Sequence, residues 1–336
     1  MKNIFLKNLK FVVLIVFIVA FAIVIPLTSS GYQMMVVDVA LLYFVAALGL
    51  SLLQGMGGMM SLAQVSFMGI GAFSTAQLSK NFGLPTLLSV ILAVFISALV
   101  SLIMGAILLR LKGSYFVFAT MGLMQILANI FLNYKPLTGG PDGMSNIPSL
   151  DLGPLSPGSD RNKWFYILLV VAFICGVFIE NIRCTHLGRA LSSVRDNEIA
   201  AMSLGINVYF TRLVAFIIAG SLAGFSGALY AHYSTFVSHS LFSQTTGTLF
   251  LMMIMLGGVN STVGTFVGAL LVTMLPEWMR PLKEYLMLIY GLGIILMMLF
   301  MPMGLAGLFQ SIIKTIKSRF PKEVSTDELS GTATEE

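Results

Sequence analysis

The sequence predicts an all-α membrane protein that crosses the bilayer about ten times. Hydrophobic residues make up 57% of the 336 residues and charged residues 10%, whereas soluble proteins carry about 25% charged residues. The charges are also clustered, because Asp38 is the only one between Lys10 and Lys80 and none lies between Arg212 and Glu277. Uncharged stretches of this length fit membrane-spanning helices, each of which needs about 20 apolar residues.

Hydropathy, with breaks at glycine, proline and polar residues, places the spans in order along the chain. They are 11–27, 34–54, 60–79, 84–109, 114–133, 164–180, 211–232, 241–257, 261–279 and 285–301. Residues 1–310 are therefore predicted to form one membrane domain, with an outer loop at 134–163. Residues 311–336 are polar and predicted to be a disordered tail.

The basic residues predict the orientation of the chain. With ten spans and both termini in the cytoplasm, thirteen of the nineteen Lys and Arg residues face the cytoplasm. This excess accounts for the net charge of +5, so nucleic-acid binding is not needed to explain it. The first span also fits a signal peptide, but no A-x-A cleavage site follows it, which favours a retained anchor. We expect a multi-pass protein of the cytoplasmic membrane.

A charged island at 183–212 stands out within this apolar chain. It contains a predicted short amphipathic helix, with Asn197 as its cap, Glu198 at its positive end and Gly205 as its stop. Ile199, Met202 and Ile206 are expected to share one apolar face. The island is therefore predicted to dock a soluble partner. The residues assigned to this contact are Arg195, Asp196, Glu198, Ile199, Ala200, Ala201, Met202, Gly205 and Ile206.

Several kinds of chemistry are missing from the sequence. No G-x-x-x-x-G-K-[ST] motif is present, and the glycine-rich stretch 257–264 has no lysine that could reach a phosphate. His232 and His239 lack a nearby carboxylate or thiol to complete a metal site. Apart from Glu180 and Glu277, which lie at span ends, Asp38 is the only acid within a predicted span, where a terminal cap or a local hydrogen bond explains it as readily as a proton relay. We expect no cofactor, no metal and no catalytic residue in this chain.

Small and polar residues indicate a candidate passage. Glycines and hydroxyls cluster at 55–73, and the pattern G-G-x-x-S followed by F-x-G recurs at 257–268, which suggests an internal repeat of the kind that transporters carry. Ordinary packing of small residues between helices explains it equally well. Ser61 and Gln64 are predicted to share a helical face that lines the passage or hydrogen-bonds a neighbouring helix. The residues assigned to the passage are Ser61, Gln64, Gln125, Asn129 and Ser261.

Together these stretches resemble a known family. Residues 61–73, the outer-loop motif 138–143, the island segment 188–206, the triplet 256–258 and the end segment 301–308 resemble the LivM-type permease of branched-chain amino acid ABC importers. The resemblance runs from about residue 35 to Leu308. In that family the segment that contains Glu198, Ala200, Ala201 and Gly205 is similar to the coupling loop that inserts into a groove of the ATPase. The family usually has glycine at the position of Ala63.

The resemblance implies a transport subunit with no enzymatic activity of its own, working by alternating access within a larger importer. It implies a LivH-type second permease, two cytoplasmic ABC ATPase subunits that bind the ATP, and an extracytoplasmic substrate-binding protein. The substrate is expected to be a branched-chain amino acid, with urea or a short amide as the alternative. An ion-coupled secondary transporter and an intramembrane enzyme are the competing classes.

Overall fold

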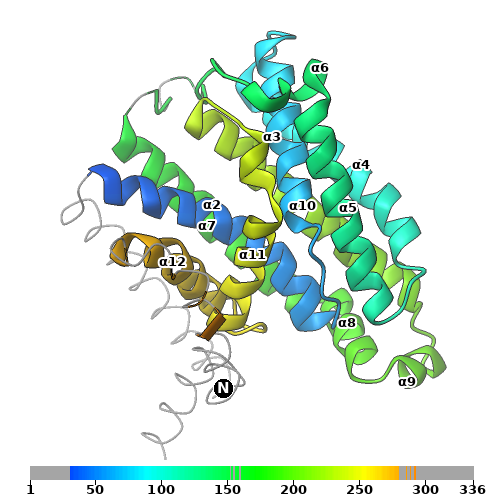
Figure 1. Ribbon diagram of the computed structural model, residues 1–336. Helices are drawn as coiled ribbons and strands as arrows, with labels where there is room; N and C mark the ends of the chain where they lie inside the picture. The colour runs from blue at the N-terminus through cyan, green and yellow to red at the C-terminus, as the bar shows by residue number, and fades with distance from the viewer. Residues whose placement is uncertain are drawn as a thin grey trace, which may run out of the picture.

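The computed structural model describes residues 31–279, apart from 152, 154, 155 and 159, together with 285, 288, 291 and 292. Within this part the regular elements are helices, and one isolated β-bridge joins Met144 to Val237 (Figure 1). The helices are α2 (Gly31–Ser51), π-helical η1 (Leu52–Met56), α3 (Gln64–Lys80), α4 (Thr86–Leu108), α5 (Ser114–Asn133), α6 (Lys135–Thr138), 3-10 helix η2 (Gly140–Asp142), α7 (Arg161–Cys184), α8 (His186–Asp196), α9 (Glu198–Ser203), α10 (Val208–Ser234), 3-10 helix η4 (His239–Phe242), α11 (Gln244–Gly257) and α12 (Thr262–Trp278).

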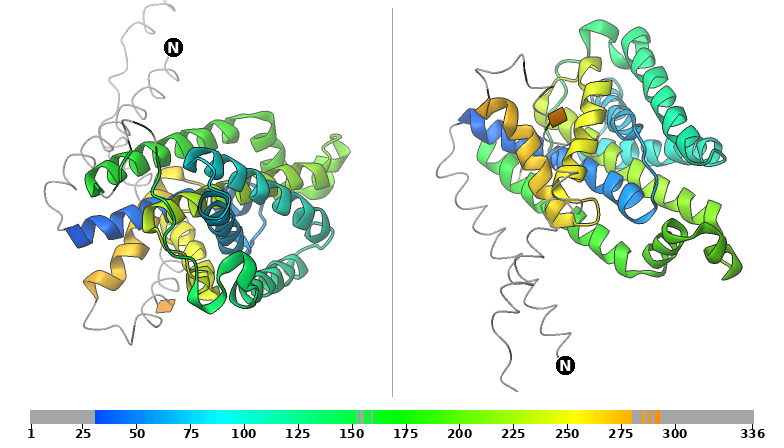
Figure 2. Two further views of the ribbon diagram at one scale, coloured as in Figure 1. Left: turned by 90° about the horizontal axis from the view of Figure 1, so that it is seen from above. Right: turned by 60° about the horizontal axis from the view of Figure 1, so that its bottom comes forward.

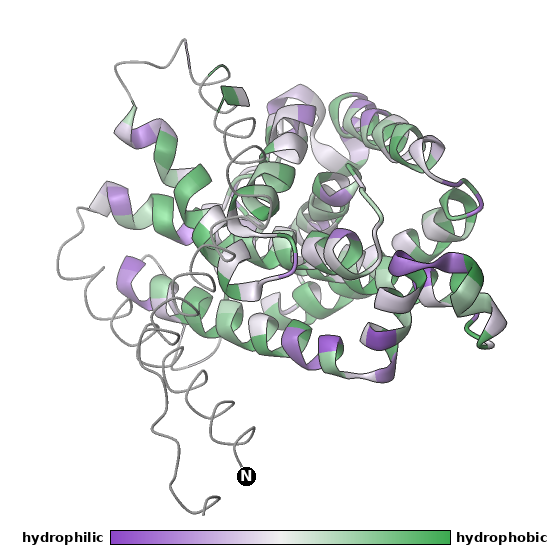
Figure 3. Ribbon diagram, turned by 90° about the horizontal axis from the view of Figure 1, so that it is seen from below, coloured by the Kyte–Doolittle hydropathy of each residue, from purple (hydrophilic) through white to green (hydrophobic). Residues whose placement is uncertain are grey.

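Five of the described helical segments are long and apolar enough to cross a membrane: Gly31–Met56, Thr86–Leu108, Ser114–Asn133, Arg161–Cys184 and Val208–Ser234. They correspond to predicted spans, although α7 and α10 extend beyond the predicted bounds because their polar ends stay helical. Hydrophilic residues lie mainly at helix ends and in loops (Figure 3). The prediction of about ten spans is not confirmed, and the span 11–27, most of 285–301 and the tail 311–336 lie outside the described residues.

The predicted span 241–257 contains the end of η4 and all of α11 rather than one continuous helix. Its helix α11 has 14 residues, a length of about 21 Å, which falls short of a hydrocarbon core about 30 Å thick. The 3-10 helix η4 and an extended Ser243 precede it. Helices α3 and α12, with 17 residues each, are also shorter than the five long segments.

Helices α2, α3 and α10 form the centre of the bundle, and α10 packs against α2, α3 and α4 (Figures 1 and 2). In the most apolar part of Gly31–Met56, which comprises α2 and η1, 83% of the residues are buried. In that of α4, 28% are buried. The exposed side chains of α4 are all apolar, and the exposed middle of α7 carries Val170, Ile174 and Phe178, with polar residues at its two ends. Such surfaces suit contact with lipid.

Glycines bring the central helices into backbone contact. A Cβ atom at Gly71 of α3 would lie 2.0 Å from the carbonyl oxygen of Gly224, and one at Gly227 of α10 would lie 1.8 Å from that of Met68. On its other side α10 meets α4, where a Cβ atom at Gly224 would lie 2.2 Å from the hydroxyl of Ser97. Small residues at helix interfaces permit this close approach.

The loop at 134–160 is anchored on the end of α10. Met144 and Val237 exchange backbone hydrogen bonds of 2.8 and 2.9 Å, and Ile147 N donates to Thr235 O at 3.1 Å. The imidazole of His232, fully buried, lies 2.7 Å from Pro148 O and 3.2 Å from the hydroxyl of Thr75. The described part of this loop is therefore ordered by contacts with α3 and α10.

We predict that Gly227→Ala lowers the thermal stability of the purified protein. The added methyl group must displace the Met68 backbone, and overpacking of this kind costs about 1–3 kcal/mol, more than the roughly 0.5–1 kcal/mol that alanine gains over glycine in a helix. The matched control is Gly122→Ala on α5, where a Cβ atom meets nothing within 4 Å. Equal melting temperatures for the two variants would contradict the packing described.

Candidate functional site

The charged island forms two helices at one end of the bundle, α8 and α9 (Figure 1). The predicted short helix is α9, and the longer amphipathic α8 before it was not predicted. Asn197 caps α9 as expected, because its side-chain oxygen accepts from Ala200 N at 3.0 Å. Gly205 ends it with a φ of +82°, and Ile206 N reaches back to Ala201 O at 3.1 Å.

The exposed apolar face of α9 differs in one residue from the prediction. Ile199 is 74% exposed and Met202 is 49% exposed, whereas Ile206 lies past the helix end and packs beside Val194, Ala201 and Val208. The turn at Gly205 reverses the chain, so Ile206 no longer follows the helical repeat. Leu204, the C-cap residue directly after α9, is a further exposed apolar side chain, at 80%. Its apolar side chain next to the helix-ending glycine was the signal that sequence reasoning missed.

Glu198 faces its own chain. Its carboxylate lies 3.1 Å from the guanidinium of Arg212 on α10 and 3.5 Å from the ammonium of Lys112 in the α4–α5 loop. Partial desolvation raises the pKa of Glu198, but the charges of Arg212 and Lys112 outweigh it and hold this pKa below its usual value. Glu198 therefore fixes α9 to two other elements of the bundle. Its assignment to a partner contact stays a prediction.

Arg195 also reaches inward. Its guanidinium donates to Asp196 at 2.9 Å and, from Nη1, to the carbonyl oxygen of Gly55 in η1. Asp196 and Ala200 are exposed, whereas Ala201 is buried beneath α9. Of the nine residues assigned to the partner contact, the exposed ones are Arg195, Asp196, Ile199, Ala200, Met202 and Gly205.

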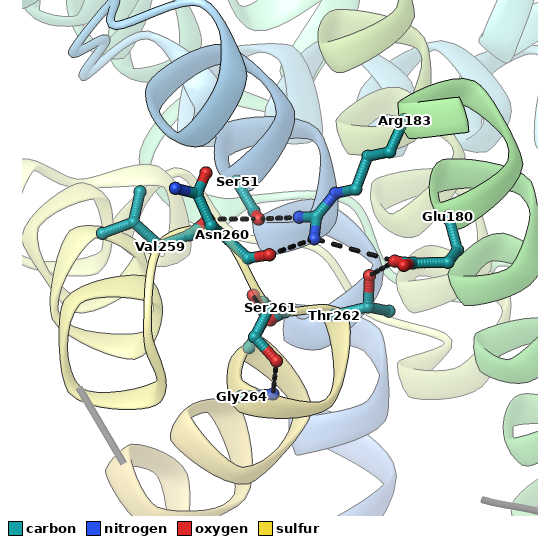
Figure 4. A network of polar contacts seen from close by, with 9 residues as sticks. Ser51, Glu180, Arg183, Val259, Asn260, Ser261, Thr262 and Gly264 are labelled. Carbon is teal, nitrogen blue, oxygen red and sulfur yellow. Dashed lines mark hydrogen bonds and ion pairs between the residues drawn. The ribbon is translucent and has the colours of Figure 1, made fainter. Parts of the chain in front are cut away.

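A polar junction lies beside the island (Figure 4). Arg183, at the end of α7, donates from Nη1 to Asn260 O and from Nη2 to the hydroxyl of Ser51 at 2.8 Å. Ser51 donates in turn to Val259 O at 2.9 Å. On the opposite edge, Glu180 lies 3.7 Å from Arg183 and accepts from Thr262 at 2.9 Å. The junction joins the end of α2, the end of α7 and the α11–α12 loop (258–261).

The two copies of the suggested repeat meet at this junction. Each connects two helices through a glycine with positive φ, +63° at Gly58 and +110° at Gly258. Ser261 caps α12 by accepting from Gly264 N at 3.0 Å, and Ser61 accepts from Ala63 N at 3.3 Å. The copies therefore share a helix–loop–helix arrangement, which supports their interpretation as a repeat.

The residues assigned to the passage do not share one surface. Gln64 is buried, and its side-chain nitrogen donates to Ala46 O of α2 and Ala219 O of α10, both at 2.9 Å. Ser61 is also buried, but it precedes α3, which begins at Gln64, so the predicted shared helical face is wrong. The break before α3 leaves Ser61 without helical geometry. Ser261, a helix cap, lies in the junction instead.

Gln125 and Asn129 lie on the exposed side of α5. The side chains of Asn129 and Asn133 donate to the backbone oxygens of Gln125 and Asn129 at 2.9 and 3.0 Å, so three amides line up one turn apart. The exposed positions of α4, by contrast, are apolar. Three amides toward lipid would be costly.

Comparison with known proteins identifies the family. Residues 34–301 match the family described as branched-chain amino acid transport system, permease component. The chain belongs to this family. It is 31% identical over 302 residues to the high-affinity branched-chain amino acid transport system permease protein LivM of Salmonella typhimurium, covering 83% of this chain and 71% of that protein. It is 30% identical over 321 residues to the protein of the same name from Escherichia coli, covering 89% and 75%.

The chain is also similar to the second kind of permease protein in the same family of systems. It is 24% identical over 257 residues to a probable LivH permease protein of Methanocaldococcus jannaschii, covering 71% of this chain and 79% of that one. No solved structure matches the chain. With its long apolar helices, this permease is a multi-pass membrane protein and a transport subunit.

Asp38 has a local partner in the permease. It is fully buried in α2, and one carboxylate oxygen accepts from the hydroxyl of Tyr233 on α10 at 2.9 Å. The other oxygen has no hydrogen-bond partner among the described residues. The local hydrogen bond that the sequence allowed is present, and it joins α2 to α10.

We predict that Gln64→Leu destabilises the permease before it slows transport. The change removes two hydrogen bonds that link α3 to α2 and α10, and lost hydrogen bonds of this kind cost about 1 kcal/mol each. Thermal unfolding of the purified variant measures the loss, with Gln125→Leu on the exposed face of α5 as the control. A variant of unchanged stability with reduced uptake would instead favour Gln64 as a passage-lining residue.

Proposed function

We propose that this chain is the LivM-type permease subunit of an ATP-driven importer that moves branched-chain amino acids inward by alternating access. The family and the printed names of the Salmonella and Escherichia coli relatives support the substrate class. The observation that carries the ATP-driven mechanism is the exposed apolar face of α9, formed by Ile199, Met202 and Leu204. An exposed apolar cluster on a short helix outside the long apolar segments favours a protein partner.

An ATPase subunit is the partner that fits this face. The permease has no phosphate-binding loop in its sequence, so ATP is expected to bind to separate cytoplasmic subunits. We place α8 and α9 on the cytoplasmic side, together with both termini, because the island carries an excess of arginine. Two such ATPases, a LivH-type permease and an extracytoplasmic binding protein would complete the importer.

The passage is proposed to run between this chain and the second permease. Gln125, Asn129 and Asn133 on α5 form the polar stripe that supports this placement. Three amides at membrane depth need hydrogen-bonding partners that lipid does not supply. A second permease can supply such groups, or leave the stripe to water and substrate.

Substitution of the α9 face tests the proposal. We predict that Ile199→Glu combined with Met202→Glu prevents the ATPase subunits from co-purifying and abolishes ATP-driven uptake. Two charges in a desolvated interface cannot be paired, which costs several kcal/mol. The control is Ile199→Leu, which keeps the face apolar and should assemble normally. Normal co-purification and uptake by the double variant would show that the ATPase docks elsewhere.

A further inference from the structure

We propose that Arg195 and Arg183 are positioning residues. They transmit the movement of the docking helices α8 and α9 to the two loops of the suggested repeat, 57–63 before α3 and 258–261 before α12. The inference rests on the proposed function, because it takes α8 and α9 as the elements that an ATPase moves. It adds the connection between these helices and the membrane domain. That connection is formed by two arginines and the backbone oxygens that they hold.

The first link runs from α8 to the end of α2. Arg195 is the last residue but one of α8, and its Nη1 donates to Gly55 O in the π-helical turn η1. The last carbonyl groups of a helix lack partners within the helix and carry its negative dipole, so a guanidinium is a favourable partner there. The Arg195 stem also packs closely, because a Cβ atom at Gly58 would lie 2.8 Å from its Cγ.

The second link runs from α7, directly before α8, to the α11–α12 loop. Arg183 donates to Asn260 O and, through Ser51, is connected to Val259 O (Figure 4). Its side chain is only 11% exposed, and its acid neighbour Glu180 lies 3.7 Å away on the solvent side. This buried charge therefore binds the α11–α12 loop and the end of α2 in addition to a carboxylate.

The two links meet. A Cβ atom at Gly55 would lie 2.5 Å from Val259 O, so η1 and the α11–α12 loop are in backbone contact. The side-chain amide of Asn260 matches its neighbours when its nitrogen faces Gly55 and its oxygen faces Arg195. In this orientation the nitrogen donates to Gly55 O at 2.7 Å, and the oxygen accepts from Arg195 Nη1 at 3.3 Å. A shift of α8 therefore displaces the ends of α2 and α11 together. These are the helices that lead into the two repeat loops.

A second set of contacts, ion pairs of Glu198, joins the island to α10 and to the α4–α5 loop. Glu198 binds Arg212 and Lys112 through exposed or partly exposed ion pairs, which are weak individually. The arginine links, by contrast, bind backbone atoms at closely packed positions. Tight backbone contacts transmit displacement because they leave no space for independent movement. The movement is thus expected to pass through Arg195 and Arg183.

The test uses the complete complex of permeases, ATPases and binding protein in proteoliposomes, with ATP hydrolysis and leucine uptake measured together. We expect Arg195→Met to assemble and hydrolyse ATP but to lose about tenfold in leucine taken up per ATP, within the usual range of coupling between sites. Arg195→Lys should restore part of the loss, because an ammonium group can still donate to Gly55 O. Ser51→Ala, a smaller change that removes one of the two acceptors of Arg183 and its connection to Val259 O, should lower the same ratio.

The matched control is Arg189→Met on α8, since among the described residues the Arg189 side chain hydrogen-bonds Cys184 O and His186, both within the island. It should couple normally. Normal coupling by both Arg195→Met and Ser51→Ala would overturn the inference, and so would an Arg195→Met complex that fails to assemble, which would show a merely structural role. Failure of the unsubstituted complex to use ATP would instead refute the proposed function.

Discussion

The close approach of α3, α4 and α10 through small residues is the constraint on which the rest of the permease depends. A glycine at position 71, 224 or 227 leaves room for a neighbouring backbone or hydroxyl where any side chain would clash. In lipid the helices gain little from the hydrophobic effect, so packing at short distance has to hold them together. This packing brings Gln64 within reach of carbonyls on both α2 and α10. The buried side-chain amide of Gln64 is thereby paired.

Backbone carbonyl groups also need hydrogen-bond donors at the end of the bundle that bears the island. Where α2 widens into a π turn and α11 stops at Gly258, backbone carbonyls leave their helices and need other donors. Arg183 and Arg195 supply these donors, and both belong to the segment that leads into the docking helices. Stability of the helix ends and the connection to α9 therefore depend on the same hydrogen bonds. In the proposed importer, this shared dependence would let α9 act on the spans.

Local features of this fold could be predicted from the sequence, and long-range ones could not. The cap at Asn197 and the stop at Gly205 depend on neighbouring residues, and both are present as predicted. The inward position of Ile206 depends on a turn that ends the helical repeat. Some partners lie far along the chain, such as Lys112 for Glu198 and Gly55, 140 positions away, for Arg195. Hydropathy likewise identified the apolar stretch at 241–257 but not the break before α11, because both short and long helices satisfy the same composition.

The energy source of transport is the central claim, and uptake by the reconstituted complex measures it most directly. Labelled leucine should enter proteoliposomes only when ATP is present on the side of α8 and α9, and collapse of proton and sodium gradients should leave the rate unchanged. Asp38 is the one buried acid of the described spans, with its partner in Tyr233. Gradient-driven uptake by this chain alone, abolished by Asp38→Asn, would contradict the account and indicate an ion-coupled carrier.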